Sequence, residues 1–167
     1  MPHLTIVTGG QSGVDRAALD VALDYGLVYA GWCPAGGWAE DFTAPPGLLA
    51  RYPDLRETPS ADPAQRTEWN VRDADAVLIL LDAGGLAASQ GTALAREHAS
   101  RHGKPLFVTA LGEPNAGDRA AEWLTAQLAG RDALRLGIGG PRESEAPGIY
   151  GHAKTLIAAI LDRVLTR

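Results

Sequence analysis

Glycine and hydroxyl residues cluster where apolar runs end, and these residue types bind anions through the backbone. The first cluster is the turn Gly9-Gly10-Gln11-Ser12-Gly13-Val14-Asp15, which follows an apolar run at 4–8. A glycine turn between a strand and a helix directs N–H groups outward at the positive end of the helix dipole, which suits a phosphate group. The turn matches neither G-x-G-x-x-G nor the Walker pattern, which needs a lysine. Asp15 either caps the helix or accepts hydrogen bonds from a ribose; the alternative is a tight turn without a ligand.

Two further clusters have similar chemistry. Ala88-Ser89-Gln90-Gly91-Thr92 follows the most apolar run and could supply N–H groups and a hydroxyl group, although Ser89 or Thr92 could simply cap a helix. Gly139-Gly140-Pro141-Arg142-Glu143-Ser144 follows the last apolar run. There Arg142 could pair with a phosphate in fork geometry, and the alternative is an exposed turn with solvated charges.

Charged side chains that could perform acid–base chemistry lie between the first two clusters. Glu40 and Asp41 are adjacent carboxylates, which can serve acid–base catalysis or metal binding but are also typical of a solvated loop. Arg66 and Asn70 share one face of a predicted helix at i, i+4, a combination suited to ligand recognition or to an exposed face. The candidate catalytic residues are therefore Glu40, Asp41, Arg66 and Glu68.

Patterns for metal binding and nucleophilic catalysis are weak. His98 and His102 have the i, i+4 spacing that suits zinc, but the glutamate of H-E-x-x-H is missing, so we expect a surface pair near a helix end. His3, His152 and Cys33 show no ligand spacing, and we predict no metal site. There is no G-x-S-x-G elbow for a serine hydrolase.

Composition limits the classes of partner. A chain of 167 residues with 46% hydrophobic residues favours one domain over 1–167. A net charge of −5, from 20 acidic and 15 basic residues, argues against nonspecific nucleic-acid binding. No apolar run approaches the roughly 20 residues of a membrane helix. The start of the chain does not resemble a secretory signal, and its single cysteine suits a reducing compartment, so we expect a cytoplasmic protein.

The candidate residues must be positioned by alternating strands and helices. Apolar, β-branched runs predict strands at 4–8, 28–33, 76–81, 105–109 and 133–138. Helical spacing predicts helices at 16–25, 64–73, 92–102 and 118–128, and after Gly148. This alternation predicts a single-domain, Rossmann-like three-layer α/β/α fold with a mostly parallel sheet. Residues 34–64, rich in proline and glycine, are expected to form a long ordered excursion. Ligands bind beyond the carboxyl ends of parallel strands, where the three clusters should meet.

Several segments together resemble a known family. They are Thr8 to Asp20, Gly31-Trp32-Cys33-Pro34, Ala39-Glu40-Asp41, Glu57-Thr58-Pro59-Ser60, Gln65 to Asp73, Gly91-Thr92, Gly140 to Ser144 and Pro147-Gly148-Ile149-Tyr150. In this order they are similar, over nearly the whole chain, to the putative molybdenum carrier family, the circularly permuted YpsA-type branch of the SLOG superfamily. That superfamily has a Rossmann-like fold and binds nucleotides or nucleotide-derived ligands. Its relatives include cytokinin-activating phosphoribohydrolases and an algal molybdenum-cofactor carrier.

The phosphoribohydrolase pattern P-G-G-x-G-T-x-x-E is kept only in part. Gly91-Thr92 are present, but Ser89-Gln90 replace the preceding glycines and Glu97 lies five residues after Thr92 instead of three. The resemblance thus implies a carrier or sensor of a phosphate-bearing, nucleotide-like ligand, with the molybdenum cofactor or a nucleotide as candidates, and a homo-oligomer (dimer or tetramer). The alternatives are a nucleotide hydrolase, such as a phosphoribohydrolase or N-glycosidase, and an interaction module in nucleotide signalling.

The residues do not decide whether the protein is an enzyme, because no complete catalytic set is present. The candidate ligand-binding residues are Gly9, Gly10, Gln11, Ser12, Gly13, Val14, Asp15, Arg16, Arg66, Asn70, Ser89, Gly91, Thr92, Gly140, Arg142 and Ser144.

Overall fold

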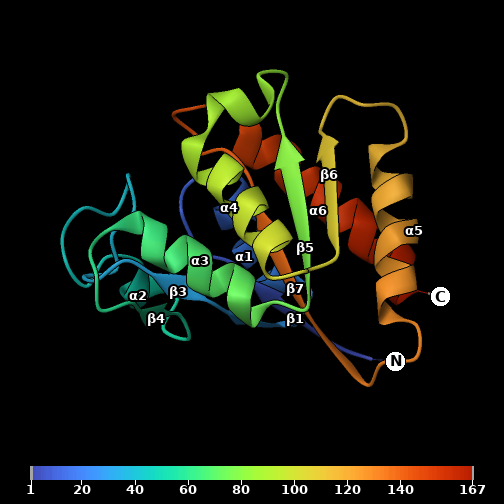
Figure 1. Ribbon diagram of the computed structural model, residues 1–167, viewed down its shortest axis with the longest axis horizontal. Helices are drawn as coiled ribbons and strands as arrows, with labels where there is room; N and C mark the ends of the chain where they lie inside the picture. The colour runs from blue at the N-terminus through green and yellow to red at the C-terminus, as the bar shows by residue number, and fades with distance from the viewer. Residues whose placement is uncertain (1, 167) are drawn as a thin grey trace.

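A five-stranded parallel sheet with helices on both faces forms the centre of the protein (Figure 1). The computed structural model describes residues 2–166. The strand order is β2-β1-β7-β5-β6. The strands are β1 (His3–Val7), β2 (Val28–Ala30), β5 (Ala76–Leu81), β6 (Leu106–Ala110) and β7 (Ala133–Gly139). The main helices are α1 (Val14–Asp24), α3 (Pro63–Asp73), α4 (Gln90–Arg101), α5 (Ala116–Leu128) and α6 (Ile149–Leu165). The predicted Rossmann-like α/β/α fold is confirmed.

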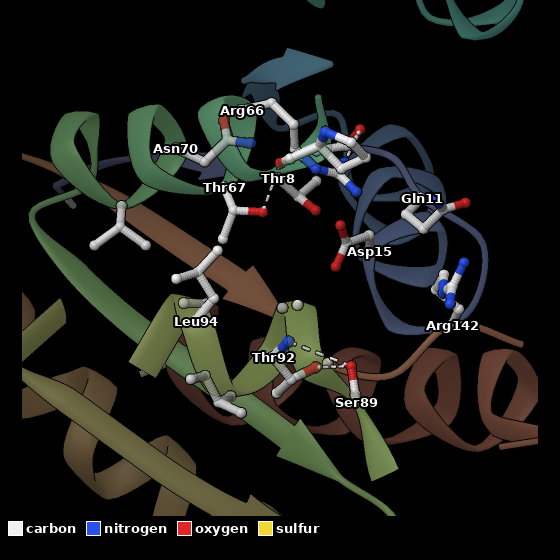
Figure 2. A pocket seen from close by; sticks show the side chains of 18 of the residues that line it. Thr8, Gln11, Asp15, Arg66, Thr67, Asn70, Ser89, Thr92, Leu94 and Arg142 are labelled. Atoms are coloured by element: carbon white, nitrogen blue, oxygen red, sulfur yellow. Dashed lines mark hydrogen bonds between the residues drawn. The ribbon is translucent and has the colours of Figure 1, made fainter. Parts of the chain in front are cut away.

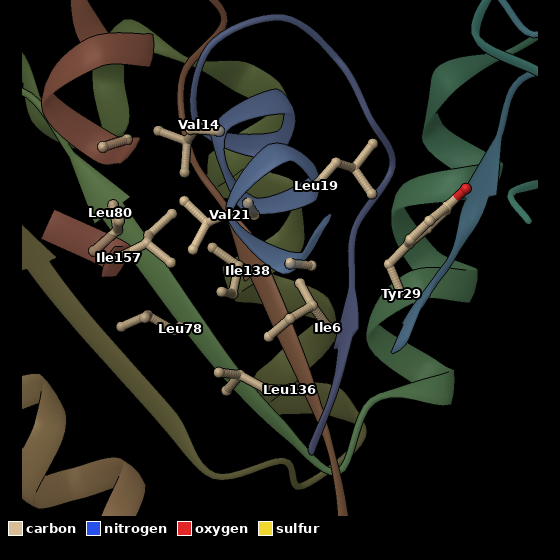
Figure 3. Packing of buried hydrophobic residues seen from close by; sticks show 14 of the residues in the cluster. Ile6, Val14, Leu19, Val21, Tyr29, Leu78, Leu80, Leu136, Ile138 and Ile157 are labelled. Carbon is tan, nitrogen blue, oxygen red and sulfur yellow. The ribbon is translucent and has the colours of Figure 1, made fainter. Parts of the chain in front are cut away.

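The two faces of the sheet are packed unequally. Side chains alternate along β5, so Leu78 and Leu80 belong to the large core under α1, α5 and α6, part of which Figure 3 shows. Val77, Ile79 and Leu81 point to the other face and join a small buried cluster with residues of α3 and α4. The smaller core leaves space between the sheet and these two helices. No helix among residues 2–166 is long and apolar enough to span a bilayer.

The single strand predicted over 28–33 is wrong, because the structure breaks it at Gly31. Gly31 has φ 146°, and a Cβ there would overlap the carbonyl oxygen of Thr8. Beyond the break, the Asn70 amide accepts a hydrogen bond from Trp32 N at 2.7 Å and donates one to Trp32 O at 2.9 Å. The chain therefore leaves β1, and β3 (Trp32–Cys33) pairs with β4 (Arg56–Glu57) in a separate two-stranded parallel sheet.

Residues 34–62 pack against the outside of α1 and contain the short helix α2 (Leu48–Arg51) as well as β4. The Tyr52 hydroxyl donates to Asp20 Oδ1 at 2.5 Å, and the hydroxyl of Tyr150, on α6, donates to Asp20 Oδ2 at 2.6 Å. Leu48 and Tyr52 are fully buried. One carboxylate on α1 thus connects this segment to α6.

Candidate functional site

A cavity of about 660 Å³ lies between the sheet and helices α3 and α4, at the carboxyl ends of β1, β5 and β7 (Figure 2). This is the edge of a parallel sheet at which ligands bind. β7 is the central strand: β1 and β2 follow it on one side, and β5 and β6 on the other. Its polar lining includes Thr8, Gln11, Asp15, Arg66, Asn70, Ser89, Thr92 and Arg142. Its apolar lining includes Val7, Val71, Val77, Ile79, Leu94 and Ile138.

Asp15 and Arg66 face the same part of this cavity (Figure 2). Asp15 lies in the first turn of α1, and the helix begins after Gly13 without a side-chain cap, so of the two roles that the sequence left open for Asp15, helix capping is excluded. Burial raises the pKa of Asp15 to about 6, against the opposing effects of the Arg66 charge and of hydrogen bonds from the backbone of Gln11 and Gly140. The carboxyl group can therefore bind or release a proton near neutral pH.

Arg66 is held in place by the loop after β1. It is 8% exposed, and its Nη1 donates to the carbonyl oxygen of Gly9 at 3.1 Å. A Cβ on Gly9 would overlap this guanidinium group, so glycine is required for the close approach. Burial lowers the pKa of Arg66 and the Asp15 charge opposes that shift. The side chain still has other N–H groups with which to bind a ligand.

Thr8 presents a buried hydroxyl group to the cavity. The residue is 2% exposed, and its Oγ1 has no hydrogen-bond partner among the described residues. A buried hydroxyl group without a partner costs about 1–3 kcal/mol. A polar ligand in the cavity could supply the missing partner.

The two helix starts near the cavity differ in how open they are. At α1, the N–H of Ser12 donates to Gln11 Oε1 at 3.0 Å and the N–H of Val14 donates to Pro141 O at 3.2 Å, so both donors are satisfied within the protein. At α4, Ser89 caps the helix by accepting from Thr92 N, but a Cβ added at Gly91 would meet no atom within 4 Å. The start of α4 is therefore the more accessible site for an anion.

Glu40 joins three segments outside the cavity wall. Its carboxylate accepts hydrogen bonds from the hydroxyl groups of Ser12 and Ser144 and from Ser144 N at 3.1 Å, and Arg142 lies 3.6 Å away. Burial opposes ionisation, but the hydrogen bonds from Ser12 and Ser144 outweigh it and hold the pKa of Glu40 below its usual range. The carboxylate is therefore ionised at neutral pH and connects the loop after β1 to the loop after β7.

Asp41 forms a bidentate pair with Arg16, at 2.8 and 2.9 Å. Arg16 is 6% exposed, and its Nε and Nη2 also donate to the carbonyl oxygen of Gly10 at 3.1 Å. The hydrogen bonds from Arg16, partly offset by burial, lower the pKa of Asp41. This pair joins the excursion to the glycine turn.

A model of the circularly permutated YpsA SLOG family matches residues 6–161. The chain belongs to this family. Among solved structures, a crystal structure of a putative molybdenum carrier protein from Syntrophus aciditrophicus SB is similar to it, with 33% sequence identity, 96% coverage of each chain and a TM-score of 0.80. No curated protein matches the chain. The resemblance found in the sequence motifs is confirmed.

In this SLOG protein the predicted ligand-binding residues divide into two groups. Those that line the cavity are Gly9, Gln11, Asp15, Arg66, Asn70, Ser89, Gly91, Thr92, Gly140 and Arg142. Those outside the lining are Gly10, Ser12, Gly13, Val14, Arg16 and Ser144. Of the candidate catalytic residues, only Arg66 lines the cavity, while Glu40 and Asp41 make the contacts described above and Glu68 lies on α3 near His98 and His102.

Sequence reasoning did not select Thr8 or Thr67 as site residues, although both line the cavity. Thr67 follows Arg66 on α3, and helical spacing from Asn70 could have indicated it. Thr8 is the polar residue that ends an apolar run directly before the glycine turn, and it also begins the first segment that resembles the family, so both features could have indicated it.

Proposed function

We propose that this SLOG protein binds a phosphate-bearing, nucleotide-like ligand in the cavity, as a carrier or sensor. The observation that carries the proposal is the division of the cavity lining into a polar and an apolar part. Its volume of about 660 Å³ falls within the range of about 300–1,000 Å³ typical of small-molecule sites. The molybdenum cofactor, which combines a flat pterin with a phosphate, has the same two chemical parts as a nucleotide.

In this proposal the phosphate lies between the start of α4 and Arg142. The unobstructed space at Gly91 and the helix dipole favour an anion there. Arg142 lines the cavity and adds a positive charge, which it shares with Glu145 at 3.3 Å and Glu40 at 3.6 Å. The ring system lies along the apolar wall that Ile79 and Leu94 help to form. Sugar or ring polar groups then meet the Thr8 hydroxyl, the Asp15 carboxyl and the Arg66 guanidinium groups.

Calorimetric titration with paired ligands tests this assignment. Nucleoside monophosphates and a phosphorylated pterin are titrated beside the same compounds without phosphate. Arg142→Ala should weaken binding of the phosphorylated member about tenfold, the size of one charge-assisted hydrogen bond, and leave the other member unchanged. Arg131→Ala, at an exposed position away from the cavity, is the control. Equal affinities for both members in every variant, or no binding at all, would contradict the proposal.

A second candidate function, hydrolysis of an N-glycosidic bond in a nucleotide, is favoured by one observation. Asp15 is a carboxyl group with a pKa of about 6 that faces the cavity, as a general acid or base requires. Product analysis after incubation with nucleoside monophosphates tests this function. Turnover that Asp15→Asn abolishes would establish it, and absence of product with wild-type protein that binds the ligand would exclude it for these substrates.

A further inference from the structure

Two histidines and a glutamate converge where α3 packs against α4, outside the cavity. His98 is buried on α4, and His102 is the residue directly after its last turn; their ring centroids are 6.4 Å apart. Glu68 lies on α3. One potential ligand atom from each residue lies within 4.8 Å of the other two. The sequence contains only the histidine spacing, and the packing of the two helices adds the carboxylate.

We infer that Glu68, His98 and His102 form a binding site for a divalent transition-metal ion such as Zn²⁺. Two imidazole nitrogens and one carboxylate oxygen are a ligand set that zinc prefers, and three protein ligands leave a fourth position for water. The i, i+4 spacing places the imidazole of the C-cap residue His102 on the same side as that of His98. With zinc–ligand bonds of about 2.0–2.1 Å, tetrahedral ligand atoms lie about 3.4 Å apart. Rotation of the exposed side chains of Glu68 and His102 toward the buried His98 closes the remaining gap.

The arginines near Glu68 and His102 form their ion pairs with other carboxylates, although the charge of Arg72 also acts on Glu68. Arg72, one turn after Glu68, pairs with Asp73 at 2.9 Å, and its guanidinium carbon lies 4.7 Å from the centroid of the Trp69 ring. Within residues 2–166, no ion pair occupies the Glu68 carboxylate. On α4, Arg101 pairs with Glu97 at 2.5 Å. An incoming metal ion therefore competes with no existing ion pair of its carboxylate ligand.

The site connects the two helices that wall the cavity. Thr67 precedes Glu68 on α3 and lines the cavity, and Leu94 and Ala95 do so on α4 in the turn before His98. A bound metal ion would cross-link α3 to α4 about one turn beyond the cavity lining of α4.

Metal titration of untagged, chelator-treated protein tests the inference. We expect one Zn²⁺ per chain by calorimetry, and a visible absorption band with Co²⁺ that shows nitrogen and oxygen ligation. Glu68→Gln and His102→Ala change exposed side chains, so both variants should fold. Each should weaken Zn²⁺ binding by more than the roughly 10- to 100-fold loss that follows removal of an outer-shell partner. His152→Ala removes an exposed histidine of α6 and should bind Zn²⁺ like the wild type.

Three results would overturn the inference. They are the absence of stoichiometric binding, wild-type affinity in Glu68→Gln and His102→Ala, and an equal loss in His152→Ala. The calorimetric signal from Zn²⁺ alone does not depend on a nucleotide-like ligand, so failure here leaves the proposed function untouched.

Discussion

The buried carboxyl group of Asp15 gives a direct test of the electrostatics of the cavity. Folding moves its pKa from 3.8 to about 6, mainly through burial. The folded protein thus holds this proton more tightly than the unfolded chain does. The resulting stabilisation is fully present below pH 3.8 and is lost as the pH rises through about 6. At about 1.36 kcal/mol for each pKa unit, the loss is about 1–3 kcal/mol, with about 3 kcal/mol as its upper limit.

Asp15→Asn resembles the protonated carboxyl group and removes its titration. Without ligand, the variant should be more stable than the wild type by about 1–3 kcal/mol above about pH 7, and this difference should shrink as the pH falls toward about 4. Urea unfolding followed by circular dichroism across this range gives both free energies of unfolding. Asp54→Asn, which removes an exposed carboxyl group, is the control. Parallel pH profiles for Asp15→Asn and the wild type would refute the reasoning, because the pairing of Asp15 with Arg66 would then balance its burial.

Three further substitutions test individual contacts by urea unfolding. Thr8→Val removes the buried hydroxyl group that has no partner, so it should leave the free energy of unfolding unchanged or raise it by about 1 kcal/mol. It should also weaken ligand binding in calorimetry. A decrease of more than about 1 kcal/mol in the free energy of unfolding would contradict this reasoning. Glu40→Ala removes the hydrogen bonds that join the two loops and should lower the free energy of unfolding by about 1–3 kcal/mol, and no loss would show that these hydrogen bonds contribute nothing. Gly13→Ala places a Cβ against the carbonyl oxygen of Pro141 at φ 81° and should cost more than about 1 kcal/mol, whereas a neutral result would show that the turn shifts freely.

Periodicity predicted the layers of the fold because it reports burial on one or both faces of an element. The six apolar residues at 76–81 form β5, which is buried along its whole length, and the four predicted internal helices are found within two residues of their predicted ends. The break at Gly31 depends on contacts with Thr8 and Asn70 that belong to other elements. Gly31 itself is the local signal, because an isolated glycine inside a strand pattern suggests a bulge or a close backbone approach, but the contacting residues cannot be read from it.

In the site, too, residues that share a local pattern could be predicted, and residues that depend on distant contacts could not. Arg66 and Asn70 were found because their helical spacing is local, and both line the cavity. The role of Glu40 depends on Ser144, which is 104 residues away in the chain. A carboxylate next to another carboxylate looks the same in a sequence whether it is catalytic or holds two loops together.

The unequal packing of the two sheet faces links the stability of the protein to its proposed function. On the face of α1, α5 and α6, the space is filled by apolar side chains. On the other face, part of β5 and the ends of β1 and β7 line a cavity, so α3 and α4 bury fewer side chains against the sheet. Less buried apolar area gives these helices less stabilisation from the hydrophobic effect. A ligand inside the cavity and a metal ion bound by Glu68, His98 and His102 would each add contacts between α3, α4 and their surroundings. Both would therefore stabilise the same wall, and each should bind more tightly when the other is already present.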